Sequence, residues 1–132
     1  MKIIQTSGKR KRAIASATLK AGKGIIRVNG KLLENYFPKY SYLRVKEPLL
    51  LGAKYADKVD IKIKVKGGGV LGQTDAVRLA IAQALVKFSN SKELEKIFLN
   101  YDKNLLVADV RRAEHSKPNI SKPRAKRQKS YR

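Results

Sequence analysis

A glycine-rich segment is the clearest candidate for binding chemistry. Gly67, Gly69 and Gly72 have the spacing Gly-x-Gly-x-x-Gly between a predicted strand and a predicted helix, which is the arrangement that holds a pyrophosphate in dinucleotide-binding domains. That motif also needs an acidic residue at the end of a second parallel strand about 20 residues later. The nearest candidates, Glu93 and Glu95, lie in a polar helical stretch instead. No Gly-Lys-Ser/Thr follows the glycines, so a phosphate-loop NTPase is excluded too.

The same segment could still bind the phosphate of another molecule. Glycines let a backbone approach a phosphate closely, and a helix N-terminus offers free N–H groups and positive potential. RNA could supply that phosphate, with Gly68, Gly69 and Gln73 as its contacts. The alternative is a turn that only joins strand to helix, and the sequence leaves both interpretations open.

The sequence contains no recognisable catalytic or metal-binding set. The single histidine, His115, lies between Glu114 and Ser116 in a charged segment, and there is no cysteine. The acidic residues are scattered, so no carboxylate pair stands out for acid–base chemistry. We therefore expect a protein that is not an enzyme, with no cofactor, no metal and no small-molecule substrate.

Positive charge dominates the chain, with 31 basic and 10 acidic residues and a net charge of +21. Nucleic acid is the natural partner, because neutralising its phosphates releases condensed counterions. The charge gathers at the ends: residues 1–12 hold five basic residues and no acid, and residues 111–132 hold nine basic residues and one acid. We expect a globular domain over 13–110, flanked by a basic N-terminal segment (1–12) and an extended cationic C-terminal tail (111–132). Both ends should stay unfolded until RNA surrounds them.

Four segments of the chain are predicted to be strands. Residues 12–20 and 25–28 flank a glycine turn and suggest a hairpin, and 105–110 suggests a last short strand. The strongest signal is at 59–66, where one face is apolar and belongs on a core. The other face should meet water or phosphate through Lys62, Lys64 and Lys66.

Helical spacing appears in four further places. Residues 32–37 fit a helix that Pro38 stops, and Pro48 suits the first turn of another helix. Residues 73–88 carry one continuous apolar stripe and form the best predicted helix. Ser91 should cap a shorter helix, whose inward residues would be Leu94, Ile97, Phe98 and Leu99.

The glycine segment and the chain ends resemble the universal small-subunit ribosomal protein nine family. Residues 67–85 follow the family's signature of three glycines, two spacers, glycine and glutamine, followed by spaced alanines. The opening 8–15 and the end 128–132, Gln-Lys-Ser-Tyr-Arg, are also similar, and the final Ser-Tyr-Arg looks like the archaeal form. The resemblance covers nearly the whole chain. One departure is Gln83, where the family usually has a basic residue.

The resemblance implies an α/β (α+β two-layer) fold. This is a four-stranded sheet with helices packed on one face and a left-handed βαβ crossover, similar to the second domain of small-subunit ribosomal protein five. Crossovers are generally right-handed, so the residues alone would not have predicted this feature.

The resemblance also implies a cytoplasmic, structural role in the head of the small ribosomal subunit during translation. Its partners would be rRNA, neighbouring head proteins and the anticodon stem-loop of peptidyl-site tRNA, with no membrane. The competing interpretation is a nonspecific architectural nucleic-acid-binding protein. The expected rRNA contacts are Lys9, Arg10, Lys11, Arg12, Lys62, Lys64, Lys66, Gly68, Gly69, Gln73, Arg111, Arg112, Lys117, Lys122, Arg124, Lys126 and Arg127. The expected tRNA contacts are Lys129, Ser130, Tyr131 and Arg132.

Overall fold

The strand with the strongest sequence signal forms the centre of the sheet. The fold comes from a computed structural model, which describes residues 2–119, 121–125 and 131. In it β5 is Val59–Lys66, and its apolar residues are buried while its three lysines are exposed. Both the bounds and the inward face of this strand are therefore as predicted.

Within the described residues, five strands form one mixed sheet in the order β1-β2-β5-β3-β4. The other strands are β1 (Ile4–Arg10), β2 (Ala13–Ala21), β3 (Ile26–Val28) and β4 (Lys31–Leu32). The β3–β5 pair is parallel, and the remaining pairs are antiparallel. The expected sheet had four strands; the additional one is β4, which is two residues long and lies at the edge.

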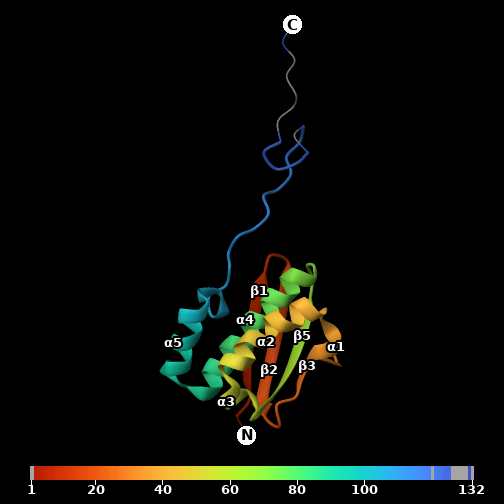
Figure 1. The fold of residues 1–132 in the computed structure, drawn as a ribbon. Helices are drawn as coiled ribbons and strands as arrows, with labels where there is room; N and C mark the ends of the chain where they lie inside the picture. Colours follow the sequence, from red (N-terminus) through yellow and green to blue (C-terminus); the bar gives the residue numbers. More distant parts are fainter. Residues whose placement is uncertain (1, 120, 126–130, 132) are drawn as a thin grey trace.

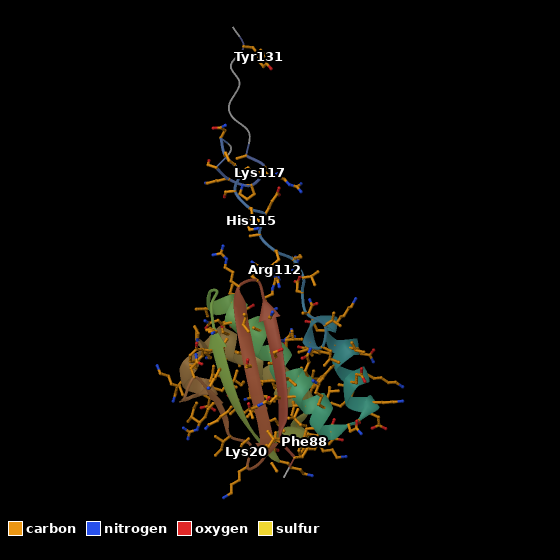
Figure 2. The ribbon with its side chains drawn as sticks, turned by 180° about the vertical axis from the view of Figure 1, so that it is seen from behind. Lys20, Phe88, Arg112, His115, Lys117 and Tyr131 are labelled. Carbon is orange, nitrogen blue, oxygen red and sulfur yellow. The ribbon has the colours of Figure 1, made fainter. Side chains whose placement is uncertain are left out.

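The helices cover one face of the sheet and leave the other uncovered (Figures 1 and 2). α4 packs directly on β1 and β2, and α2 packs on α4. This confirms the expected two-layer arrangement. The helical elements are α1 (Leu33–Tyr36), α2 (Lys39–Leu51), α3 (Ala53–Ala56), α4 (Val70–Ser89), α5 (Lys92–Tyr101) and the 3₁₀ helix η1 (Lys103–Leu105).

The connection between the two parallel strands is a left-handed crossover. β3 and β5 run parallel side by side, and the chain passes from one to the other through β4, α1, α2 and α3. In Figure 1 the helices face the viewer, both strands point upward, and β5 lies to the left of β3. The chain therefore leaves the top of β3, passes in front of the sheet through the helices, and enters β5 on the left. This path is a left-handed crossover, as the family resemblance implied.

The predicted hairpin of 12–20 with 25–28 is wrong, because β5 lies between these two strands. The N–H groups of Gly22 and Gly24 donate to the carbonyls of Lys58 and Val59, which attaches the turn to the start of β5. The hairpins are β1–β2 and the short β3–β4. β2 and β3 each pair with the distant strand β5, and this replaces the direct pairing between them that the glycine turn suggested.

Residues 4–10 belong to the sheet rather than to a separate N-terminal segment. Ile4, Thr6 and Gly8 face inward on β1, which packs against α4. The Thr6 hydroxyl donates to the carbonyl of Ala80 at 2.8 Å. A Cβ at Gly8 would overlap the carbonyl oxygen of Ala76. The expectation was wrong because small and polar residues, not bulky apolar ones, form most of the inward face of β1.

The helices confirm some predictions and correct others. The long helix and the Ser91 cap are confirmed, since α4 spans 70–89 and the Ser91 hydroxyl accepts the N–H of Leu94. Pro48 lies inside α2 instead of starting a helix, because Ser41, Val45 and Pro48 together form its buried face. On α5 only Leu94 and Phe98 are buried, as expected for residues one helical turn apart. The other two inward residues predicted there, Ile97 and Leu99, are exposed.

The predicted strand at 105–110 is also wrong. Asp102 caps η1 by accepting the N–H of Asn104, and Leu105 is buried at the end of that turn. The described residues after it, 107–119, 121–125 and 131, contain no helix or strand. In Figure 1 the chain leaves the domain at the end where the β1–β2 turn lies.

Candidate nucleic-acid interface

The uncovered side of the sheet carries a dense set of basic side chains, which we call the open sheet face. Alternation along β1, β2, β3 and β5 turns every second side chain outward there, and Figure 2 views this side. Six of these outward residues are basic, and each is exposed: Lys9, Lys20, Arg27, Lys62, Lys64 and Lys66.

The strand register sets the spacing of these charges. Lys62, Lys64 and Lys66 succeed one another along β5 at intervals of about 7 Å, twice the rise per residue. Arg27 lies beside Lys62 on the neighbouring strand. The face is hollowed at two places, of about 760 Å³ and 330 Å³, and both hollows are lined by Arg27 and Lys62. A flexible polyanion could therefore contact several cations at once.

One acidic residue lies among these cations, and it has a structural role. Asp60 Oδ1 accepts the N–H groups of Lys23 at 2.9 Å and Ile25 at 3.0 Å. The bonds from Ile25 and Lys23 lower the pKa of Asp60 below its ordinary value. Asp60 thus orders the turn between β2 and β3, and one carboxylate among six cations leaves the open sheet face positively charged.

The glycine loop between β5 and α4 has two different parts. Gly67 and Gly68 have positive φ angles of 79° and 67°. A Cβ at Gly67 would lie 2.6 Å from the carbonyl oxygen of Arg12, so this part must be glycine to pack on the β1–β2 turn. Gly69 is extended, with φ −97°, and a Cβ there would have nothing within 4 Å. The space at the N-terminus of α4 is therefore open.

Gln73 holds this loop in place. Its Oε1 accepts the Tyr36 hydroxyl at 3.0 Å, and its Nε2 donates to the Gly67 carbonyl at 3.2 Å. Asn29 continues the network, because its Nδ2 donates to Tyr36 Oη and to the Val65 carbonyl. Gln73 was expected to contact RNA; its side chain has these internal partners, and the RNA contact stays a prediction.

Arg10 is likewise used inside the protein. Its guanidinium lies 3.6 Å from Asp75 and 3.3 Å from Asp109, and its side chain is only 15% exposed. Asp109 also binds Arg111 at 2.7 Å. Hydrogen bonds from the side chain and then the N–H of Arg111 lower the pKa of Asp109 far below its ordinary value. Asp109 thus fastens the start of the C-terminal tail to β1 through Arg10.

The open sheet face, the glycine loop and the fastened tail can be compared with known proteins. Residues 8–132 match the sequence profile of the family described as Ribosomal protein S9/S16. The chain belongs to the ribosomal protein S9/S16 family. The signature and chain ends noted in the sequence thus led to the right family, and membership in a family of ribosomal proteins agrees with a role other than catalysis.

Curated relatives of this S9/S16-family chain match it from end to end. Small ribosomal subunit protein uS9 of Methanococcus maripaludis (strain C7) is 50% identical over 134 residues, covering all of both chains. Small ribosomal subunit protein uS9 of Methanococcus vannielii is 47% identical with the same coverage. Both organisms agree with the archaeal form that the C-terminal Ser-Tyr-Arg resembles.

Four further basic residues predicted to contact rRNA gather near one end of the domain. Lys11 and Arg12 form the exposed β1–β2 turn, and Lys11 has φ 55°. The Arg12 carbonyl faces the glycine loop. Arg111 and Arg112 follow Asp109 where the tail leaves this same end (Figures 1 and 2). The β1–β2 turn, the loop at 67–69 and the start of the tail therefore share one region.

The predicted contacts within the tail are exposed where the structure describes them. Lys117 and Arg124 both lie near Glu114, at 3.8 Å and 3.1 Å, and Lys122 is exposed. Tyr131 is 88% exposed. Five predicted contacts lie outside the described residues: Lys126, Arg127, Lys129, Ser130 and Arg132.

The open sheet face includes two cations that the sequence analysis did not select. Lys20 and Arg27 point to the same side as the lysines of β5. Each follows the alternation of its strand, but the sequence shows that they share a face with the β5 lysines only once the pairing of β2 and β3 with β5 is known.

Gln83, the position where this chain departs from the family pattern, donates a hydrogen bond to the Leu106 carbonyl at 3.1 Å.

Two other kinds of site are absent from the part of the chain that the structure describes. Within residues 2–119, 121–125 and 131, no cluster of three or more histidine or acidic side chains could hold a metal ion. Within the same residues, no helix has the length and apolar character needed to cross a bilayer.

Proposed function

We propose that this chain is a structural component of the small ribosomal subunit and binds rRNA through its open sheet face. Its relatives carry that subunit in their names, and this supports the assignment and a place on cytoplasmic ribosomes. The observation that carries the rRNA contact is the row of exposed cations on β5 and β3, which outnumber the single carboxylate of Asp60. These cations bind phosphate without reading sequence.

The β1–β2 turn and the glycine loop form a second contact in this proposal. Lys11 and Arg12 supply charge, and the open space at Gly69 lets a phosphate approach the N-terminus of α4. Arg111 and Arg112 extend this surface toward the tail. The domain would then contact rRNA through two adjoining surfaces. One is the open sheet face, and the other is the end of the sheet where the β1–β2 turn and the glycine loop lie.

A triple lysine substitution tests the open sheet face. Changing Lys62, Lys64 and Lys66 to glutamine removes three charges and leaves the buried side of β5 intact. We expect the slope of log affinity for small-subunit rRNA against log salt to become shallower by about 2 to 3, at about 0.7 to 0.9 for each phosphate that is no longer neutralised. Filter binding over a salt series measures this slope.

The matched control changes three lysines on the helical side of the domain to glutamine: Lys54, Lys92 and Lys96. It removes the same charge, so an equal change of slope in both variants would show that only net charge matters and would refute a localised site. The same assay with duplex DNA at matched salt tests the competing architectural role. Equal affinity for DNA and rRNA would favour that role.

We further propose that the C-terminal tail supports peptidyl-site tRNA. Three features support this role: the excess of basic residues from Arg111 onward, the exposed Tyr131, and the absence of helix and strand in the described part of the tail. A segment of this kind gains its order from an RNA partner. The contacts would come from Lys129, Ser130, Tyr131 and Arg132, with the Tyr131 ring free to stack on a base or ribose.

Deletion of residues 127–132 tests the tail separately from the domain. It removes three basic residues but none of the sheet or helices. We expect normal entry into small subunits, weaker peptidyl-site tRNA binding, and a defect that grows as salt is raised. tRNA affinity measured on reconstituted subunits provides the readout. Unchanged affinity would rule out the tail contact without affecting the proposed role of the open sheet face.

A further inference from the structure

The helical side of the domain has a groove whose chemistry differs from that of the open sheet face. It lies between α2 and the C-terminal end of α5, has a volume of about 440 Å³, and is called the tyrosine groove below. Its lining residues are Tyr40, Leu43, Arg44, Glu47, Arg78, Tyr101 and Asp102.

The groove exposes large apolar and aromatic side chains. Tyr40 is 69% exposed, Leu43 is 53% exposed and Tyr101 is 54% exposed. Tyrosine is enriched at the centres of protein–protein interfaces, where one ring supplies both apolar area and a polar group. Exposed side chains of this size gathered around one groove point to a macromolecular partner.

Two carboxylates lie beside these rings and share one buried arginine. Arg78 is 5% exposed and donates to Glu47 and, at 3.0 Å, to Asp102. The two carboxylate side chains remain 31% and 34% exposed. Burial raises the pKa of Asp102, but the bonds from the Asn104 N–H and Arg78 outweigh it, so that the pKa is lowered and the group is charged at neutral pH.

Among the residues that the structure describes, every cation lining the groove is paired with an acid. Arg78 is engaged by two carboxylates, and Arg44 is paired with Asp75 at 3.1 Å. In a chain of net charge +21, the groove is therefore a surface where exposed carboxylate balances the positive charge. A phosphate brought here would meet two exposed carboxylates and two arginines that are already paired, whereas a guanidinium or ammonium group would meet carboxylate oxygens and aromatic rings.

We propose that the tyrosine groove binds a basic segment of a neighbouring protein in the small ribosomal subunit. An arginine or lysine of that segment contacts the tyrosine rings and the exposed oxygens of Glu47 and Asp102, and an apolar residue beside it packs on Leu43. The inference rests on the proposed place of this chain in the subunit, and it assigns the helical side to protein and the open sheet face to RNA.

Photo-crosslinking in assembled small subunits tests this division. One full-length variant carries p-benzoylphenylalanine in place of Tyr101, and a matched variant carries it in place of Thr18 on the open sheet face. We expect the first to crosslink to an Arg- or Lys-containing segment of another small-subunit protein, and the second to crosslink to rRNA. Mass spectrometry of the crosslinked peptides and nucleotides identifies both partners.

The two probes separate failure of the inference from failure of the proposed function. A crosslink from position 101 to rRNA, to a segment without basic residues, or to nothing while position 18 reacts, would overturn the inference. A protein crosslink from position 18 would contradict the proposed rRNA contact of the sheet, and a basic protein segment at position 101 would still support the groove.

Direct binding then tests the tyrosine rings. The crosslinked segment, made as a synthetic peptide, is titrated against the full-length protein by fluorescence anisotropy. We expect Tyr40→Ser with Tyr101→Ser to weaken binding roughly tenfold, because both cation–ring interactions are removed, and Tyr101→Phe to change it less than about twofold, because the ring remains. Both variants leave the Arg78 ion pairs intact. Unchanged affinity in the double serine variant would overturn the proposed contact.

Discussion

Two glycines in one loop allow a test that separates protein packing from phosphate binding. Gly67 and Gly69 lie two residues apart, but only Gly67 has a positive φ and a close backbone neighbour. Valine adds the same bulk at both positions, so Gly67→Val and Gly69→Val form a matched pair. Their behaviour distinguishes the two interpretations of the glycine segment that the sequence left open.

The structure predicts different effects of the two substitutions on the stability of the free protein. At Gly67 a β-branched residue must adopt φ 79° and bring its Cβ to 2.6 Å from the Arg12 carbonyl. Strain and overpacking of this kind cost about 3 kcal/mol together, which lowers the Tm of a domain this size by about 10 to 20 °C. At Gly69 the backbone is extended and the space is open, so valine should change stability by less than about 1 kcal/mol.

Thermal unfolding of each variant is measured first, and incorporation into reconstituted small subunits second. If a phosphate approaches Gly69, then Gly69→Val should fold like the wild type and still enter subunits poorly. Gly69→Ala, with a smaller side chain, should show a weaker defect. Normal incorporation of Gly69→Val would refute the phosphate contact, and a fully stable Gly67→Val would refute the packing argument itself.

Further predictions concern the ion pairs. Arg78→Met should lower the free energy of unfolding by about 2 to 3 kcal/mol, because it leaves two carboxylates unpaired that are only partly hydrated; urea unfolding checks this. Asp60 and Asp109 have lowered pKa values in the folded protein. Their contribution to stability is therefore full above about pH 4 and lost as pH falls through their folded values. Asp60→Asn and Asp109→Asn should flatten the acid limb of a stability–pH curve, and an unchanged limb would contradict both assignments. Arg10→Gln should increase protease cleavage near Arg111, because the tail loses its attachment to β1.

The elements with strong, regular periodicity were predictable from the sequence. β5 alternates Val, Ile, Ile and Val with charged residues, and α4 carries a continuous apolar stripe. β1 was missed because Thr6 and Gly8 supply much of its inward face, and neither residue signals a core. The order of the strands was missed because it depends on β5 pairing with both β2 and β3, which no local turn signal encodes.

Residues of the candidate site were predictable by type but not by orientation. Lys9 and Arg10 are neighbours in one basic run, yet alternation on β1 turns Lys9 to the open sheet face and Arg10 toward Asp75 and Asp109. Composition cannot separate them, because an arginine used for packing and one used for phosphate look the same in a sequence. The tyrosine groove was missed for a similar reason, since its acids and rings come from α2 and from the end of α5, far apart along the chain.

The position of β5 between β2 and β3 has a consequence for synthesis of the chain. β1 and β2 can pair as soon as they leave the ribosomal exit tunnel, because they are adjacent in the sequence. β3 emerges next and can pair with the two-residue β4, but its other edge gains no partner until β5 has been made. A nascent chain therefore exposes one unpaired edge of β3 while the intervening helices are translated. Pairing between distant segments slows folding, so a pause before Lys66 would prolong the period in which that strand can meet the wrong partner.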